Sequence, residues 1–169
     1  MKNTFPTKVK ISPLEEVLKY ENKNVIDRFM NYFSTSKDEA NIIFNETKKW
    51  LWLCAKSFED KTSIYINNDL LIIDEMWHTF IIFTLDYELF CKKYFNTLIH
   101  HVPTVKNEIP ENFSKKEKIL FLKNREDQFF NYVYDNLGNE TTNLWFLEIP
   151  QKYSKQNINR LFKGIYPEK

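Results

Sequence analysis

Apolar residues recur at steps of three and four along most of this chain, which is the spacing of one face of an α-helix. The longest such stripe follows Ser36, which stands three residues before Glu39 in the spacing of a capping box, and it continues to Phe58. Shorter stretches with the same spacing predict helices over residues 13–21, 25–33 and 155–163. The pattern therefore favours a helical fold over one built from strands.

The second half of the chain carries another strong helix signal. Ser114 and Glu117 repeat the capping-box spacing, and the apolar stripe that follows predicts a helix that stops before Gly138. Beyond this glycine, Trp145 and Phe146 lie in a segment that is too apolar for a free chain end. We expect both rings to dock on the rest of the domain.

The composition agrees with a single helical domain. Glycine occurs only twice in 169 residues, and no repeat or linker divides the chain. Aromatic residues make up 17% of the sequence, with 15 Phe and 9 Tyr, so large rings are available to fill a core. We predict one all-α domain over residues 1–169, with about six helices around an aromatic-rich core and a motif region over residues 65–150.

Charge and hydropathy limit the partners and the compartment. The net charge is +1 and only three residues are arginine, which gives little attraction for nucleic acid or an anionic membrane. No apolar run approaches the ~20 residues that span a bilayer, and the N-terminus lacks the apolar run of a secretory signal. From the charge and the hydropathy we predict that the protein binds neither nucleic acid nor membranes. Cys54 and Cys91 have no local pairing motif, so we also predict a cytoplasmic protein.

All three histidines, His78, His100 and His101, occur in one segment. On a single straight helix His78 and His100 would stand about 33 Å apart, too far to share a site. Two positions favour a turn of the chain between them. Thr84 begins a pattern typical of a new helix, and Asn96 suits a helix end because asparagine tolerates the left-handed conformation.

A turn at Asn96 would let the chain return along the helix that precedes it. An extended return of four or five residues covers roughly 13–17 Å, enough to bring the His-His pair toward His78 and Tyr87. Since adjacent side chains of an extended segment point in opposite directions, at most one of His100 and His101 should face such a cluster. We predict a polar pocket between the helix and the returning segment.

The residues of this pocket suggest metal binding. Asp74 and His78 are four residues apart, so they share a helix face and can orient each other or ligate one ion. The predicted metal ligands are Asp74, His78, His100 and His101, and the metal would be a divalent transition ion such as zinc or iron. The predicted lining of the pocket is Asp74, Trp77, His78, Tyr87 and Cys91.

Two other interpretations remain open at this stage. The histidines can be structural, with Asp74 accepting a hydrogen bond and the His-His turn bonded to backbone carbonyls. Alternatively, His78 or His101 can act as a proton acceptor in metal-free chemistry, although the sequence marks no nucleophile and no phosphate loop. The sequence therefore leaves open whether the protein is an enzyme.

Two tryptophans, Trp50 and Trp52, bear on a different kind of function. Both fall away from the main apolar stripe of the helix that begins after Ser36. Either they contact a second layer of helices, or they remain exposed as an anchor for another protein. The exposed alternative would favour an interaction module over an enzyme.

The segment with the histidines also resembles a known motif set. Its residues are Asp74-x-x-Trp77-His78, Tyr87, Phe90-Cys91, Tyr94-Phe95 and Ile99-His100-His101-x-Pro103. This set is similar to one in uncharacterised bacterial proteins related to the glycine-rich-domain-containing-protein-like family. Where that family has Phe-Gly before the histidine pair, this chain has Phe95-Asn96, and both pairs accept a left-handed turn. The resemblance implies a shared helical domain and no particular reaction.

These observations lead to one preferred function and one alternative. We predict a small helical domain whose His/Asp/Tyr pocket binds a metal ion or a small ligand. The alternative is a non-catalytic helical module that binds a protein partner and in which the histidines are structural.

Overall fold

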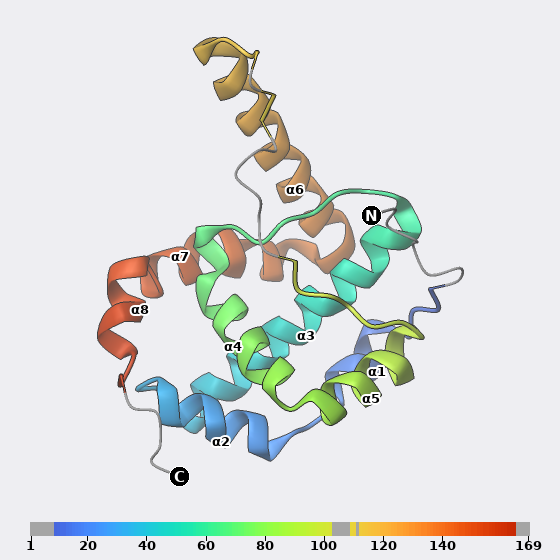
Figure 1. Ribbon diagram of the computed structural model, residues 1–169, viewed down its shortest axis with the longest axis vertical. Helices are drawn as coiled ribbons and strands as arrows, with labels where there is room; N and C mark the ends of the chain where they lie inside the picture. The colour runs from blue at the N-terminus through green and yellow to red at the C-terminus, as the bar shows by residue number, and fades with distance from the viewer. Residues whose placement is uncertain (1–8, 103–108, 111, 165–169) are drawn as a thin grey trace.

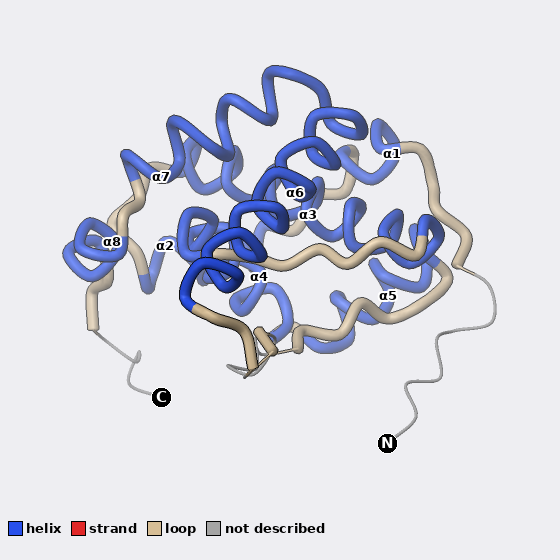
Figure 2. Tube along the Cα trace, turned by 90° about the horizontal axis from the view of Figure 1, so that it is seen from above, coloured by secondary structure: helices blue, strands red, loops and turns tan. Residues whose placement is uncertain are grey.

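The computed structural model describes residues 9–102, 109–110 and 112–164. Within these ranges the regular structure is helical, and the β pairing is an isolated bridge between Phe33 and Phe162. Figure 2 accordingly shows helices joined by loops. The predicted all-α fold is confirmed. Pro103, the last residue of the histidine motif set, lies outside the described residues.

The elements follow one another in the order labelled in Figure 1. They are α1 (Leu14–Leu18), α2 (Lys23–Tyr32), α3 (Lys37–Asp60), the 3₁₀ turn η1 (Asn68–Leu70), α4 (Leu71–Ile82), α5 (Thr84–Phe95), α6 (Lys115–Asn143), the π-helical turn η2 (Leu144–Glu148), α7 (Ile149–Lys152) and α8 (Lys155–Leu161).

Helix α3 runs through the middle of the molecule and packs against α1, α2 and α4 (Figure 1). Its first turn is capped as expected, because the Ser36 hydroxyl accepts a hydrogen bond from the Glu39 amide. Aromatic rings fill the space between the helices, and Phe80 contacts Phe44, Phe90 and Tyr87. The expected aromatic-rich core is confirmed.

Both tryptophans of α3 are packed within the domain. Trp50 is buried, and its ring lies 6.4 Å from that of Trp77 and 6.1 Å from that of Trp145. Trp52 is partly buried, and its Nε1 donates to the backbone oxygen of Ser12. The exposed alternative is therefore wrong, because Trp50 packs between helices and Trp52 is bonded to the segment that precedes α1.

Helix α6 begins with the predicted capping box, in which Ser114 and Glu117 bond each other's backbone amides. Its first half extends away from the rest of the molecule (Figure 1). The helical geometry breaks at Gly138, which has φ +78°, a left-handed value that favours glycine. Contrary to the prediction, the chain then resumes a helix and runs on to Asn143.

The C-terminal segment docks on α3 through a buried polar network. Trp145 is fully buried, and its Nε1 donates to Glu46 Oε2 at 2.8 Å. The other carboxylate oxygen of Glu46 accepts from Lys49, whose Nζ also contacts Thr141. Phe146 packs at the edge of the core against the ring of Phe129. The expected docking of both rings is confirmed.

A buried lysine lies between α3 and the chain that joins α1 to α2. Lys48 is only 2% exposed, and its Nζ donates to the backbone oxygens of Leu18 and Tyr20 at 2.7 Å each. Burial lowers the pKa of this ammonium from 10.5 to about 8. The folded chain therefore releases this proton at a lower pH than the unfolded chain does.

This difference predicts a pH dependence of stability. Between pH 8 and 10.5 the unfolded chain holds a proton that the folded chain has lost, so the free energy of unfolding should rise with pH, and below this window Lys48 should give no slope. The expected rise is of the order of 3 kcal/mol. Urea denaturation across the window should show the rise in the wild type and a smaller one in Lys48→Met. Identical slopes in the two proteins would contradict the prediction.

Along the described ranges, no helix combines the length and the apolar character needed to cross a bilayer.

Candidate functional site

The segment that contains the histidines folds as two helices and a returning strand-like arm. Helix α4 ends at Ile82, a single residue, Phe83, changes the chain direction, and α5 begins at Thr84. Helix α5 ends where Asn96 takes the left-handed conformation, with φ +54°. Both turns were predicted from the sequence, and both are confirmed.

Buried hydrogen bonds hold the returning segment against the two helices. The Tyr87 hydroxyl of α5 donates to the backbone oxygen of Ile99 at 2.5 Å. The same oxygen of Tyr87 accepts from Trp77 Nε1 of α4 at 2.9 Å. Because His101 follows Ile99 by two residues, this chain of bonds fixes the position at which His101 meets α4.

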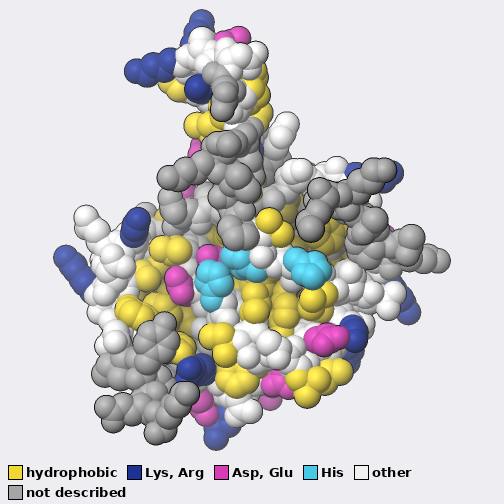
Figure 3. Space-filling view, in the orientation of Figure 1, with side chains coloured by type: hydrophobic (Ala, Val, Ile, Leu, Met, Phe, Trp, Pro, Cys, Tyr) yellow, Lys and Arg dark blue, Asp and Glu magenta, His cyan; other side chains and the backbone are white. Residues whose placement is uncertain are grey.

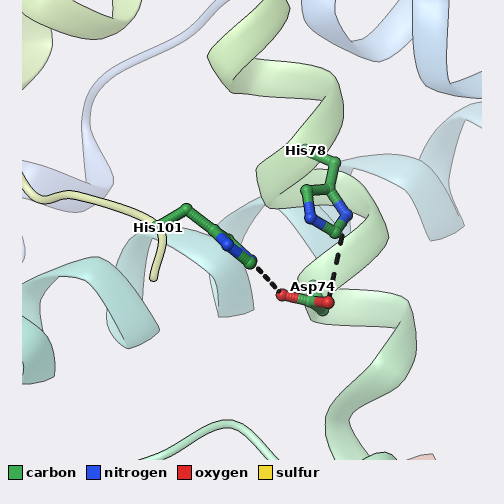
Figure 4. Close-up of side chains that lie close together, drawn as sticks. All are labelled: Asp74, His78 and His101. Atoms are coloured by element: carbon green, nitrogen blue, oxygen red, sulfur yellow. Dashed lines mark hydrogen bonds and ion pairs between the residues drawn. The ribbon is translucent and has the colours of Figure 1, made fainter. Parts of the chain in front are cut away.

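Three side chains converge at this meeting point: Asp74 and His78 from one face of α4, and His101 from the returning segment (Figure 4). His101 Nε2 lies 2.8 Å from Asp74 Oδ1, and His78 Nδ1 lies 3.9 Å from Asp74 Oδ2. One ligand atom from each residue lies within 4.8 Å of the other two. These three residues thus form a group whose side chains are common metal ligands.

The group lies at the surface with one closed and one open side. The side chains of Asp74 and His101 are 16% and 19% exposed, whereas that of His78 is 47% exposed. The ring of His101 packs between those of Trp77 and His78, with centroids 4.4 Å from each. Asp74 and His101 are therefore held in place, while His78 can rotate at the solvent side.

Of the predicted ligands, His100 does not join this group. It is exposed and lies outside the group of three residues, as expected when adjacent residues of an extended segment face opposite sides. Its inclusion among the metal ligands is corrected accordingly. The expectation that only one of His100 and His101 faces the cluster holds for these described residues, and that residue is His101.

Three predicted lining residues lie behind the group and not around it. Trp77, Tyr87 and Cys91 are almost fully buried. Burial raises the pKa of Cys91 to about 11 and that of Tyr87 far above its ordinary value. Both side chains are therefore protonated at neutral pH, and neither belongs to the group of three converging residues. Their place in an open pocket is corrected to that of a supporting wall.

Glu75 is a neighbour that the sequence analysis did not select. Its Oε2 lies 4.0 Å from His78 Nδ1, and burial raises the pKa of this carboxyl. It stands three residues before His78, a spacing that places the two side chains on adjoining parts of the helix. That spacing was the available signal, and it places a second carboxylate beside the group.

The surface around the histidines is largely apolar. Figure 3 shows the histidine side chains on the same face as many hydrophobic side chains. The exposed large apolar residues of α4, α5 and the returning segment are Ile82, Leu85, Leu89, Leu98 and Val102. The group is therefore a polar site within a hydrophobic surface, which is typical of sites that bind a ligand or a partner.

The family comparison includes this whole site. The model of the UCP032817-like family matches residues 16–123, which is more than half of the chain and includes Asp74, His78 and His101. The chain belongs to the UCP032817-like family. Searches of curated proteins and of solved structures found no match.

The range matched by the UCP032817-like family model begins in α1 and ends in the first third of α6. This range contains the two chain turns and the bonds of Tyr87 that position His101. The group and the hydrogen bonds that support it therefore lie within the matched range.

Proposed function

We propose that Asp74, His78 and His101 bind a divalent transition metal, zinc or iron, and leave part of its coordination open to water or a small ligand. The observation that carries this proposal is the convergence of two imidazoles and one carboxylate from two separate segments. Two histidines and one carboxylate are a donor set typical of sites at which zinc or non-haem iron keeps open positions.

The distances support a site that needs only a local rearrangement. Ligand atoms at about 2.0–2.2 Å from a zinc ion can be at most about 4.4 Å apart. The three donor atoms lie within 4.8 Å of one another, and binding would require the half-exposed His78 to turn toward Asp74 and the hydrogen bond between His101 and Asp74 to open. Protein ligands would occupy three positions, and the exposed side next to His78 is where a fourth ligand would enter.

The supporting wall favours the same function. Trp77 and the Tyr87 hydroxyl anchor the segment of His101 before any ion arrives, which lowers the conformational entropy lost on binding. Neighbours behind the ligands commonly orient them and tune their affinity in metal sites. The motif residues lie within the matched family range, which supports extending this site to related proteins that carry them, including the bacterial proteins whose motif this chain resembles. A cytoplasmic setting, supported by the free Cys54 and Cys91, stays a prediction.

Elemental analysis of protein purified without a histidine tag tests the proposal. We expect about one zinc or iron per chain, since three donors converge on a single position. His78→Ala and His101→Ala should each weaken zinc binding by at least about 10- to 100-fold. Loss of a residue that only orients a ligand typically has an effect of this size, and loss of a ligand itself should have at least the same effect.

His100→Ala is the matched control for these variants, because His100 is next to His101 in sequence and outside the group. It should retain the metal and the zinc affinity of the wild type. The proposal fails if no stoichiometric metal is found and added zinc does not bind, or if His100→Ala weakens binding as much as His101→Ala.

A second candidate is the non-catalytic interaction module, which the exposed apolar residues around the group favour. In that case the bond from His101 to Asp74 serves only to hold the returning segment. Asp74→Asn separates the two functions, because an amide oxygen still accepts a hydrogen bond from His101 but is a poor transition-metal ligand. Loss of metal with an unchanged melting temperature supports the metal site, and an unaltered zinc affinity supports the structural role.

A further inference from the structure

A cavity of about 510 Å³ lies beside the start of α2 and one face of α3, and it shares no residue with the Asp74 group. Its apolar part is formed by side chains that include Tyr20, Ile26 and Phe44. Cavities of about 300–1,000 Å³ with apolar walls and a few polar groups are the usual size of small-molecule sites. The cavity therefore has the dimensions of a ligand site.

The polar part of this cavity comes mainly from one face of α3. Lys37, Asn41, Asn45 and Lys48 follow one another at steps of four, four and three residues, so they line the cavity as one row. Lys23, at the start of α2, adds another ammonium. The lining therefore contains three lysines and one acidic residue, Glu21. The cavity is a positively charged environment that also offers amide donors.

Lys48 makes this arrangement more than a group of surface lysines. Its side chain is buried, and backbone oxygens accept two of the three N–H bonds that an ammonium can offer. Within the described part of the chain it forms no salt bridge, although the charge of Glu21 acts on it and its Nζ lies 5.3 Å from the ring centroid of Phe44. A buried cation is costly unless a negative charge approaches it. An anion in the cavity would provide that charge.

We propose that this cavity binds a small organic carboxylate, with its anionic group at Lys48 and its apolar body against Tyr20 and Phe44. Asn41 and Asn45 line the cavity in the same row, and their amides are the groups we expect to donate to the carboxylate. This site is independent of the proposed metal site, because the two have no residue in common.

Titration with benzoate and with benzamide tests the charge requirement directly. The two probes have nearly the same shape, and only benzoate is negatively charged. We expect saturable benzoate binding that is at least about tenfold tighter than benzamide binding, because a charge-assisted hydrogen bond is much stronger than a neutral one. Lys48→Met, which keeps an apolar side chain of similar length, should remove this preference.

Two matched variants serve as controls. Lys92→Met removes an exposed lysine that pairs with Glu88 on α5, and it should bind benzoate like the wild type. His101→Ala excludes binding of the carboxylate to a metal, and it should also leave the affinity unchanged. This second variant separates failure of the cavity proposal from failure of the metal proposal.

A measurement on the wild type covers the case in which Lys48→Met does not fold. In NMR titrations with pH, saturating benzoate should raise the pKa of Lys48, because the ammonium gains a negative neighbour. Equal affinities for benzoate and benzamide, an unchanged pKa of Lys48 at saturation, or full benzoate affinity in folded Lys48→Met would each overturn the proposal.

Discussion

Replacing Trp145 with alanine is expected to lower the free energy of unfolding by about 3–5 kcal/mol. The indole is fully buried and packs against the ring of Trp50, so its removal leaves a large cavity between the C-terminal segment and α3. It also removes the donor to Glu46, a carboxylate that is itself buried. Urea denaturation of the wild type and the variant measures the loss.

Two further variants separate the contributions. Trp145→Phe keeps a ring and removes the N–H, so it should lose less than Trp145→Ala while still leaving Glu46 with one bond fewer. Leu147→Ala changes an exposed neighbour in the same turn and should remain within about 0.5 kcal/mol of the wild type. If Trp145→Ala were as stable as Leu147→Ala, docking of this segment would not contribute to stability.

The docking of Trp145 also bears on the candidate metal site. The ring of Trp50 contacts those of Trp145 and Trp77, and the ring of Trp77 lies 4.4 Å from that of His101. A continuous row of aromatic rings therefore connects the C-terminal segment with the helix that carries Asp74 and His78. Rigid packing of such a row is one way in which a domain keeps metal ligands in fixed positions.

Signals that act over a few residues were readable in the sequence. The caps at Ser36 and Ser114, the break before Thr84 and the left-handed end at Asn96 each depend on local backbone chemistry, and the structure contains all of them. Together they predicted that the chain returns and that Asp74 and His78 share a face. They could not predict the register of the return.

The register depends on a long-range contact. The bond from Tyr87 to Ile99 decides that His101, and not His100, faces α4. A shift of one residue in an extended segment would exchange the two side chains. The sequence could therefore limit the site to one of the pair, but the choice between them required the folded structure.

Burial of polar residues was the other feature that periodicity did not reveal. Lys48 stands four residues after Phe44 on the same face of α3, but lysine is rarely buried, so the apolar pattern does not predict its burial. The backbone oxygens of Leu18 and Tyr20 accept hydrogen bonds from its ammonium. These residues are distant in sequence, so a local pattern around Lys48 cannot predict the contact. For Trp50 the pattern left burial and exposure open, and its contacts with Trp77 and Trp145 show that it packs within the domain.

The Tyr87→Phe variant is expected to lower the free energy of unfolding by about 2–4 kcal/mol, because it leaves two buried groups without a partner. The hydroxyl of Tyr87 accepts from Trp77 and donates to the carbonyl of Ile99, and the thiol of Cys91 also interacts with this hydroxyl. Since Ile99 precedes His101 by two residues, the same change should loosen the returning segment and weaken zinc binding by about 10- to 100-fold. Denaturation with urea and titration with zinc measure the two effects.

Tyr134→Phe is the matched control for Tyr87→Phe, because Tyr134 is half exposed on α6 and should change neither property. A double variant then tests whether Tyr87 acts through His101. If it does, adding Tyr87→Phe to His101→Ala should cause little further loss of zinc affinity, although it should still lower stability. A zinc affinity in Tyr87→Phe equal to that of the wild type, together with the expected loss of stability, would show that the bond to Ile99 supports the fold but does not position the metal ligand.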